Sequence, residues 1–516
     1  MAFTGPAYKL VFSGSFNGSE NIQLIPKESM ITGSRNINSH NGGLEKRGGT
    51  ETVGSQVGAG PDSLGGGMLI KRSAGSKHVY FAGVDGVIYR DGVSVKTGRN
   101  TTAYNHYTTG DDEIFICNGK NPVQVDTGSA IADISAASAD WTGSAQPTGC
   151  VVHAKGASRR MFFWGVTGKE DTLYYSSLGA FQTNTGGTSG TIVIDTQHGD
   201  GITNCISKDG VLFIFSKNNV FILEDSSTTV STWGSFSAAV KGGCFSPRHA
   251  VVIKNQIFSI DATADIYEVL TGVELRDYKR ASIVIPFELH NYIKQEWDIA
   301  KIDQWHLSYE PRTQSLRIGG VRLGQSEVDT HLVYYVNQNK WASPHDSIDN
   351  SADSGLQAAS AFAAESSDGE SLLYTQDYNG FTWLVESTTK SDNGNGYNSI
   401  VSTPWLEFDL HSIQKRWPYA ILHYKTQGNF QLTVDWFVDD VQQATDTVTL
   451  GSTAGTLGSF ILDTDVLGTI NLTAKEFTLR QQGEKIRFLF SNSGAGEDFF
   501  LSHLIIPFIA RGLRRL

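Results

Sequence analysis

Hydrophobic residues in this chain recur in short, strand-like runs that come in pairs. In the first pair, residues 78–92, two runs of β-branched and aromatic residues flank Asp85-Gly86. An Asp-Gly pair suits a two-residue hairpin turn, because both central residues of that turn need positive φ. A second pair, Asp91-Gly92, ends the second run. The pattern therefore predicts a β-hairpin that turns at Asp85-Gly86.

Versions of this hairpin recur along the chain. Their first strands begin near residues 79, 113, 160, 210, 255, 314 and 371. A period of roughly 40–50 residues with paired strands in each unit indicates a β-propeller. We therefore predict an all-β protein built mainly from a β-propeller of six to eight blades, with seven favoured. An array of β-sandwiches gives similar spacing and stays open as an alternative, because neither a Trp-Asp nor a kelch motif recurs.

Three other stretches complete the reading up to residue 400. Residues 1–30 carry short apolar patches broken by Gly, Ser and Asn, and we expect an N-terminal arm laid on another surface. Residues 285–302 have the longest helix-compatible pattern, and residues 346–370 are small and polar, which predicts a solvent-exposed loop. Residues 31–400 are predicted to form the propeller.

The pattern changes after Asn393-Gly-Asn-Gly396. Residues 405–410 alternate strictly between apolar and polar, which predicts a strand, and Asp439-Asp440 is expected to form a turn. Seven or so strands within about 110 residues are typical of a β-sandwich. We therefore predict a C-terminal β-sandwich-like domain and tail over residues 401–516, with strands near 419–424, 429–438, 446–450, 459–462, 476–480, 485–490 and 499–509.

Composition agrees with an all-β protein and limits its partners. The chain has 516 residues with 55 Gly, 11% aromatic residues and only 18% charged residues, and its formal net charge is −12. Tight sequence-independent binding to DNA relies on Lys and Arg that neutralise phosphates, so the charge argues against it. The N-terminus does not look like a signal peptide, and no apolar run approaches the ~20 residues of a membrane span. We expect synthesis in the cytoplasm and no membrane span.

The cysteines and histidines give no metal-site motif. The four cysteines, Cys117, Cys150, Cys205 and Cys244, have no close neighbours in sequence, whereas zinc sites use pairs such as Cys-x-x-Cys. We expect buried free thiols made in a reducing cell. The thirteen histidines show no His-Glu-x-x-His or His-x-His motif, and one such as His306 is expected at the surface or in the core. No metal ligand or cofactor site is predicted.

Short turn-based motifs resemble the nozzle or tail-hub (packaged-DNA stabilisation) proteins of short-tailed bacteriophages, the podoviruses. These motifs are Arg35-Asn-Ile-Asn38 with the following residues 41–49, then residues 199–203 and residues 244–252. The resemblance covers roughly residues 30–400 and, more loosely, the rest of the chain. The residues that carry its first motif are Arg35, Asn36, Asn38, Asn41, Gly42, Lys46, Arg47 and Gly48.

The resemblance implies a structural virion protein of the phage tail. In that family several copies of a β-propeller, six by resemblance, form a ring below the portal and adaptor proteins. The ring continues the channel for double-stranded DNA without reading its sequence, retains packaged DNA, permits ejection, and anchors a needle or plug and often the tail spikes. This chain lacks an obvious long insertion that would serve as a gate. An acidic wall would let DNA slide, because like charges repel over a Debye length of about 8 Å.

Candidate catalytic groups are weak. Sialidase-type propellers repeat a Ser-x-Asp-x-Gly-x-Thr-Trp box, and the single approximation here, residues 207–213, lacks the residue between Asp and Gly. Asp261, Asp265 and Glu268 flank a hairpin, where turn formation is the common role of Asp. We therefore predict no catalytic residue and no enzyme.

The chain ends with three arginines, Arg511, Arg514 and Arg515. They suit an exposed tail or, in a tail hub, an interface with a carboxylate of a neighbouring subunit or partner, because Arg forks match carboxylates. Two other classes of function stay open. One is a carbohydrate-binding or glycan-cleaving propeller of a tail or secreted protein, favoured by the Ser/Thr/Asn-rich loops. The other is a cellular scaffold propeller that binds only proteins.

Overall fold

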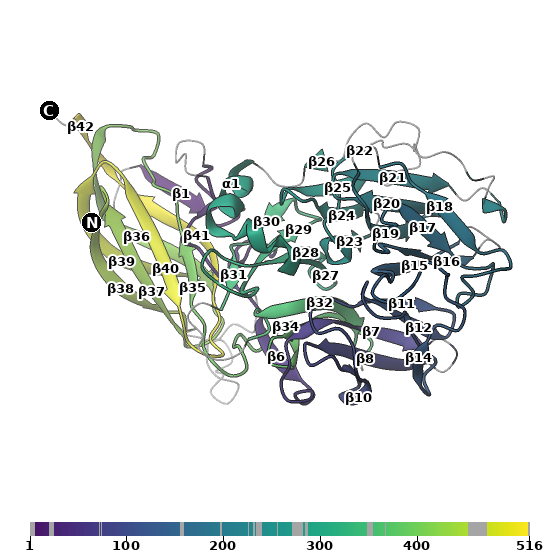
Figure 1. Ribbon diagram of the computed structural model, residues 1–516. Coiled ribbons are helices and arrows are strands. Elements are labelled where there is room, and N and C mark those ends of the chain that lie inside the picture. Colours follow the sequence, from purple (N-terminus) through teal and green to yellow (C-terminus); the bar gives the residue numbers. More distant parts are fainter. Residues whose placement is uncertain are drawn as a thin grey trace.

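The structure is a computed structural model, in which most of the chain is described. The described residues are 6–19, 25–71, 73, 75–154, 159–196, 199–224, 227–230, 233, 240–254, 256–270, 282–283, 287–347, 354–366, 368–451 and 472–513. Within this part the protein is all-β apart from a few short helices (Figure 1). None of the helices in the described ranges is both long and apolar enough to cross a membrane.

Four-stranded antiparallel sheets follow one another along the first three quarters of the chain. The first two sheets are β7 (Ser63–Lys71), β8 (Ser76–Gly83), β9 (Ile88–Arg90), β10 (Val93–Lys96), and β11 (His106–Gly110), β12 (Glu113–Cys117), β13 (Gln124–Asp126), β14 (Ile131–Asp133). The third and fourth are β15 (Gly149–His153), β16 (Arg160–Trp164), β17 (Thr172–Tyr175), β18 (Gly190–Val193), and β19 (Ile202–Lys208), β20 (Val211–Ser216), β21 (Asn219–Glu224), β22 (Val240–Lys241).

Three further sheets complete this series. The fifth is β23 (Ala250–Ile253), β24 (Gln256–Ile260), β25 (Ile266–Leu270) and β26 (Ser282–Ile283). The sixth is β27 (His306–Glu310), β28 (Ser315–Gly320), β29 (Thr330–Tyr335) and β30 (Lys340–Trp341), with β31 (His345–Asp346) also paired to β29. The seventh is β32 (Ala358–Glu365), β33 (Ser371–Asp377), β34 (Thr382–Ser387) and β6 (Gly49–Val53).

The sheets form a ring, which is the β-propeller arrangement. The first strands of neighbouring sheets contact each other: β7 contacts β11, β11 contacts β15, β15 contacts β19, β23 contacts β27, and β27 contacts β32. The ring closes because β32 of the seventh sheet contacts β7 of the first (Figure 1). The outer strand of the seventh sheet is β6, which comes from the N-terminal side of the chain and pairs with β34.

Sheet-to-sheet packing explains the long apolar runs in the sequence. Strand β16 is buried along its whole length. Phe163 packs into a cluster with the second sheet, whereas Phe162 and Trp164 pack against the fourth sheet. Because successive side chains of a strand point to opposite faces, a strand covered on both faces needs apolar residues at every position. The interior of the ring is therefore a series of apolar layers between neighbouring sheets.

The C-terminal unit consists of two sheets that face each other. One has the order β39 (Leu472–Gly483), β36 (Ile413–Lys425), β41 (Phe500–Pro507), β5 (Leu44–Lys46), β4 (Ile37–Asn38), with β1 (Ala7–Val11) paired to β41 and β42 (Ile509–Leu513) paired to β36. The other has the order β35 (Ser399–Ser402), β40 (Ile486–Asn492), β37 (Gln431–Val438), β38 (Val441–Thr449). Rings from both sheets, such as Trp436 and Phe477, meet between them at 6.0 Å.

The N-terminal segment joins both parts, which moves two expected boundaries. Strand β1 lies in the C-terminal unit, as expected of an arm on another surface, but β4 and β5 belong there too. A short parallel pair, β2 (Phe16–Asn17) and β3 (Met30–Ile31), lies between them in sequence. The propeller strands therefore run from Gly49 to Ser387, not from residue 31 to residue 400, and β35 starts the second C-terminal sheet at Ser399. The apolar core is shared, because buried residues of the fifth and sixth sheets and of the C-terminal unit form one cluster.

The seven predicted hairpins are present, as the second and third strands of each sheet, but the first turn differs. Ala82 pairs with Ile88, so Asp85-Gly86 lies inside a longer loop and is not a two-residue turn. The two-residue turn is Asp91-Gly92, between the paired residues Arg90 and Val93, with φ of 53° and 80°. Asp439-Asp440 forms the predicted turn in the same way, with φ of 48° and 70°.

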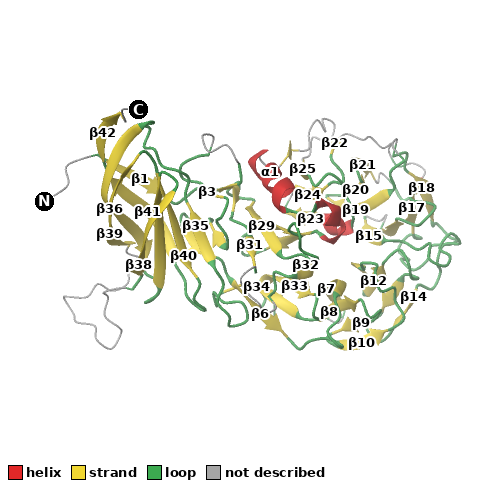
Figure 2. Ribbon diagram, turned by 60° about the vertical axis from the view of Figure 1, so that its left-hand side comes forward, coloured by secondary structure: helices red, strands yellow, loops and turns green. Residues whose placement is uncertain are grey.

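The predicted helix is present, but the predicted loop over residues 346–370 and the predicted strand over residues 405–410 are not found as expected. Helix α1 (Phe287–Glu296) and the 3-10 helix η4 (Ile299–Gln304) lie in the predicted helical stretch, and α1 lies between the propeller and the C-terminal unit (Figure 2). The loop predicted over residues 346–370 is wrong in part, because β32 is the innermost strand of the seventh sheet, where small residues such as Ala358 fit between β7 and β27. The strand predicted over residues 405–410 is also wrong: Leu406 and Phe408 are buried, but positive φ at Phe408 and Asp409 turns the chain. The strand predicted near 459–462 lies outside the described residues.

Candidate functional site: the buried junction around Arg47

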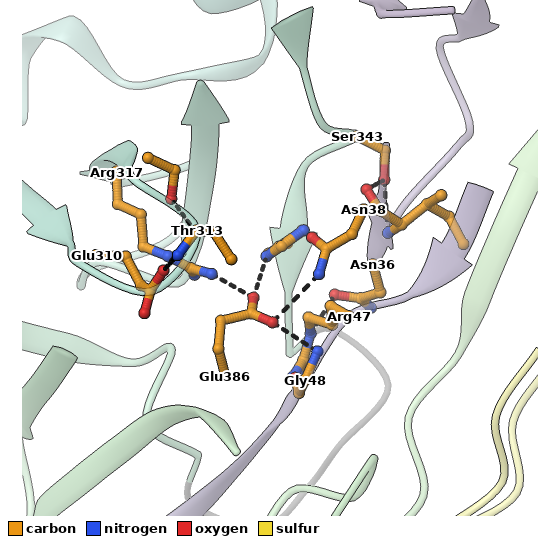
Figure 3. Close-up of polar contacts among 12 residues, drawn as sticks. Asn36, Asn38, Arg47, Gly48, Glu310, Thr313, Arg317, Ser343 and Glu386 are labelled. Atoms are coloured by element: carbon orange, nitrogen blue, oxygen red, sulfur yellow. Dashed lines mark hydrogen bonds and ion pairs between the residues drawn. The ribbon is translucent and has the colours of Figure 1, made fainter. Parts of the chain in front are cut away.

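The Asn/Gly-rich segment of residues 35–48 lies where the propeller meets the C-terminal unit. It forms β4 and β5 at the edge of one C-terminal sheet and then runs directly into β6 of the seventh propeller sheet. Five of its eight motif residues have side chains or backbone buried in this junction. Polar groups of this segment and their partners form a network, which we call the junction network. Its members are Asn36, Asn38, Arg47, Gly48, Arg317, Glu386 and Asp392, and Figure 3 shows the part around Glu386.

Arg47 is fully buried and uses its whole guanidinium group. Its two terminal nitrogens donate to the two carboxylate oxygens of Asp392 at 2.9 and 2.6 Å, in a bidentate ion pair. Nε donates to Oδ1 of Asn36 at 2.8 Å, and one terminal nitrogen also donates to the Gly48 carbonyl. The ring of Tyr397 lies 3.8 Å from the guanidinium carbon. This fixed fork geometry is the one in which an Arg–carboxylate pair is strongest.

Glu386 is the second centre of the junction network. It lies one residue before the end of β34; its carboxylate pairs with Arg317 of the sixth sheet, and the neutral ring of His345 lies 3.4 Å away. Its other oxygen accepts hydrogen bonds from the backbone N–H of Gly48 at 2.6 Å and from Asn38 at 3.2 Å (Figure 3). Burial alone would raise the pKa of Glu386, but the charge of Arg317 and the hydrogen bond from the Gly48 N–H hold that pKa well below its usual range. The carboxylate is therefore ionised and ties two propeller sheets to the N-terminal segment.

The two motif asparagines explain why Asn stands at these positions. Asn36 has φ of 59°, a left-handed conformation that Asn tolerates better than most residues. Its side chain donates to the Asn398 carbonyl at 2.7 Å and accepts from the Asp346 backbone at 2.9 Å. Asn38 accepts from the hydroxyl of Tyr335 at 2.7 Å. Both side chains therefore fix the segment to strands more than 290 residues further along the chain.

Lys46 and Gly48 complete the buried part of the motif. The Lys46 ammonium donates to Asn492 at 3.1 Å and to the Gly494 carbonyl at 2.8 Å, in the C-terminal unit. Burial and the neighbouring Arg47 lower the pKa of Lys46 to about 8. At Gly48 a Cβ atom would lie 2.5 Å from the Glu386 backbone, so only glycine allows this close approach.

The other predicted site residues lie away from the junction network. Arg35 forms a backbone bridge with Ile400, and Asn41 and Gly42 form an exposed turn in which Asn41 donates to Glu45 at 2.8 Å. Arg511 is exposed on β42. Arg514 and Arg515 lie outside the described residues. The structure thus brings together Asn36, Asn38, Lys46, Arg47 and Gly48, whereas β42, which carries Arg511, lies at the end of the C-terminal unit remote from the propeller (Figure 1).

The weak catalytic candidates are used in local structure. Asp261 accepts hydrogen bonds from the backbone N–H groups of Thr263 and Asp265, as a turn-forming Asp does, and Asp265 pairs with His290 at 2.8 Å. The cysteines are all buried and free, as expected, although Cys117 and Cys150 share one core cluster. Within the described ranges, no three His, Cys, Asp or Glu side chains are arranged to hold a metal ion.

The sequence reasoning missed the partners of the motif. Arg317, Glu386 and Asp392 lie about 270 to 345 residues away in sequence from Arg47 or Gly48, and none belongs to a local motif. A single sequence carries no signal for such long-range ion pairs. Chemically, the junction network holds ionised groups in fixed geometry and uses them in contacts within the chain. Its arrangement is that of a joint between two parts of the protein.

Comparisons with known proteins give distant structural matches. No protein-family model matches the chain, and neither does any curated protein. Among solved structures, YCF48 bound to D1 peptide matches with a TM-score of 0.39 at 10% identity, over 66% of this chain and 95% of that one. The Pan2 WD40 domain of Neurospora crassa matches with a TM-score of 0.38 at 10% identity, over the same shares. The N-terminal domain of Nup159 matches with a TM-score of 0.35 at 10% identity, over 72% of this chain and 99% of that one. This chain is thus similar to β-propeller proteins of diverse kinds.

Proposed function

We propose that this protein is a structural virion protein of a phage short tail. In this proposal the chain is a seven-bladed β-propeller with a C-terminal β-sandwich, and about six copies form a ring, the nozzle or tail hub, below the portal and adaptor. The ring continues the DNA channel, retains packaged DNA, permits ejection, and anchors a needle or plug and spikes. Its place is the tail of the virion.

One observation carries the proposal. The segment that resembles the tail-hub family, residues 35–48, is the one that joins the propeller to the C-terminal unit, through the buried ion pair of Arg47 and through hydrogen bonds of Gly48 to Glu386 and of Lys46 to Asn492. Those contacts and the shared apolar core make the two parts one body. A conduit wall that holds packaged DNA needs such a joint, because a loose hinge would yield under load. The net charge of −12 supports DNA passage, since a basic lumen would retain the phosphates.

The test is assembly of the purified full chain, alone and with a cognate portal–adaptor complex. Negative-stain electron microscopy and light-scattering mass should give closed rings with an open centre in at least one of the two samples. A chain that stays monomeric and ignores the portal complex would overturn the proposal. In a ring reconstruction we expect an acidic lumen, and a lumen lined with Lys and Arg would overturn the sliding argument alone.

A glycan array and a soluble-substrate hydrolysis assay, run on the same sample, separate the proposal from a carbohydrate-directed propeller. Saturable binding to a glycan by a chain that forms no ring would favour that alternative.

A further inference from the structure

A groove of about 760 Å³ lies between the seventh and the first propeller sheets. Apolar side chains of both sheets form its walls, namely Met68, Val79 and Phe81 of the first sheet and Phe362 and Tyr374 of the seventh. Two exposed valines of the outermost strands also line it: Val53 of β6 is 43% exposed and Val93 of β10 is 65% exposed. The groove therefore opens to solvent between β6 and β10.

This contact between sheets is less completely filled than the others. Between the third and fourth sheets, a single cluster that includes Leu212 fills the space. Between the seventh and first sheets, the buried apolar residues fall into two separate clusters, one with Phe81 and the other with Tyr374. Cβ atoms built on Gly54 and Gly92, which also line the groove, would meet no described atom within 4 Å. The groove is therefore open space between two apolar surfaces.

The groove is closed at both ends by contacts that cross from one sheet to the other. At one end, Lys77 of β8 pairs with Glu365 of β32 at 3.1 Å. At the other end, Val57 follows β6, packs in a cluster with Phe81, and donates its N–H to the Gly380 carbonyl at 2.9 Å. Its volume lies in the range of about 300–1,000 Å³ that is usual for small-molecule pockets. A bounded space of this size suits a small molecule, whereas a polypeptide running along the groove would meet one of the closed ends.

The charged groups of the groove are already paired within the chain. Among the described lining residues, the charged ones are Lys77, Asp91 and Glu365. Lys77 and Glu365 pair with each other, and Asp91 accepts a hydrogen bond from the Val79 N–H at 2.8 Å and is hydrogen-bonded to Nδ1 of His78 at 2.7 Å. Transfer of an ion into an apolar site without a partner charge is costly. The groove therefore favours an uncharged ligand, and its two carboxylates disfavour an anion most.

Aromatic rings stand on both walls. The rings of Phe362 and Tyr374 are stacked, with centroids 5.9 Å apart and an angle of 23° between their planes. On the first sheet, Phe81 packs edge to face on Tyr89 at 6.3 Å. A flat aromatic ligand between the walls would contact rings of both sheets, and it would bury the apolar surface that is now exposed.

We propose that this groove binds an uncharged, flat aromatic small molecule, with its rings between Phe81 of the first sheet and Phe362 and Tyr374 of the seventh. The ligand enters between β6 and β10 and completes the apolar layer between the two sheets. This site does not depend on the proposed role in a tail.

The test uses the full chain and two fluorescent probes with the same rings. N-phenyl-1-naphthylamine is uncharged, and 8-anilino-1-naphthalenesulfonate adds one sulfonate; both gain fluorescence in an apolar site. Titration should show saturable binding of the uncharged probe, and the sulfonate should bind at least about tenfold more weakly, because its charge finds no partner. Absence of saturable binding of the uncharged probe would overturn the proposal. Equal or tighter binding of the sulfonate would overturn the choice of an uncharged ligand.

Two pairs of variants place the binding in the groove. Thr382→Trp fills the groove from β34 and should abolish binding, whereas Thr382→Val keeps the volume and should keep binding. Val93→Lys puts a charge at the mouth and should weaken binding several-fold. Val193→Lys is its matched control, because Val193 is 63% exposed on β18 of the third sheet, outside the groove. Unchanged binding by a Thr382→Trp chain that circular dichroism shows to be folded, or equal binding by the two lysine variants, would overturn the assignment.

Light-scattering mass separates a small ligand from a second copy of the chain. The parent chain and Thr382→Trp should have the same mass, because the groove does not join copies in this proposal. A folded Thr382→Trp chain with a smaller mass than the parent chain would identify the groove as a contact between copies and overturn the small-molecule assignment.

Discussion

Two contacts within this protein are made by opposite chemistry. The third and fourth propeller sheets meet through apolar side chains such as Trp164, Leu212 and Ile214. The junction network between the propeller and the C-terminal unit instead buries Arg47 and Glu386 with their partners. Apolar contacts stabilise roughly in proportion to the area that they bury and need no fixed direction. A buried ion pair works only when every partner is in place, so the junction specifies one arrangement of the two parts.

The largest expected effect comes from removing one charge of the junction. Arg47→Met leaves Asp392 buried without its partner, and we expect a loss of about 3–5 kcal/mol in the free energy of unfolding. Urea denaturation followed by fluorescence measures it. Arg159→Met is the matched control, because the ion pair of Arg159 with Asp111 is exposed and should contribute less than about 1 kcal/mol.

The same experiment has an internal check. A double variant, Arg47→Met with Asp392→Leu, removes both charges, and it should be more stable than Arg47→Met alone. Equal losses for Arg47→Met and Arg159→Met would show that the junction is not held by this pair.

A somewhat smaller effect is expected in the apolar contact. Leu212 is 0% exposed between the third and fourth sheets, so Leu212→Ala should cost about 2–5 kcal/mol through lost contacts and the cavity that it leaves. Because no charge is removed, the loss should be the same at pH 7.5 and at pH 5.5. A loss that differs between the two pH values would contradict this prediction.

Low pH should destabilise the region of the junction, because it contains a buried histidine, His331. His331 is buried beside the junction, and burial and Arg317 lower its pKa to about 3. The folded chain therefore keeps His331 neutral, while the unfolded chain binds a proton below the ordinary pKa of 6.5. Stability falls as the pH drops from 6.5 toward 3, by up to about 1.4 kcal/mol per pH unit for each such group.

Urea midpoints at pH 7.5 and 5.0 test this with His331→Gln, which keeps a donor for the Leu356 carbonyl. The variant should lose up to about 2 kcal/mol less than the parent chain on acidification. His411→Gln is the control, because the side chain of His411 is 78% exposed, and it should follow the parent chain. A parent chain with the same stability at both pH values would contradict the prediction.

The smallest effect is local to a propeller turn. Gly92 has φ of 80°, and Gly92→Ala should cost about 1 kcal/mol, because a Cβ atom disfavours the left-handed region. Neither Gly92 nor Gly67 would bring an added Cβ atom within 4 Å of a neighbour, so the strain at Gly92 is purely a backbone effect. Gly67→Ala lacks the positive φ and should cause no loss in thermal melts. Equal losses in the two variants would contradict the turn argument.

The sequence predicted the middle of each propeller sheet and missed its inner strand. Residues 211–216 and 219–224 are almost wholly apolar, because both faces of these strands are covered by neighbouring sheets. Inner strands such as β11 (His106–Gly110) and β32 combine small and polar residues, because they crowd near the axis of the ring. Such strands look like loops in a single sequence.

The sequence marked residues 35–48 as a motif but did not show what these residues contact. Glycine and asparagine are typical of tight backbone geometry, and Asn36 and Gly48 adopt it here. The partners of this motif could not be found, since ion pairs such as Arg47 with Asp392 join residues 345 positions apart. The resemblance to tail-hub proteins and the interface predicted for the exposed Arg511 stay proposals.

The place of the N-terminal strands has a consequence for how the chain is made. Strand β6 pairs with β34 in the seventh sheet, and β1 and β5 pair with β41, near the end of the chain. A ribosome adds about 5–20 residues per second, so the first strands wait roughly 20–90 s for their partners to emerge. A chain released early can complete neither the ring nor the C-terminal unit. Only full-length product reaches the native state, and synthesis itself thus screens out incomplete chains.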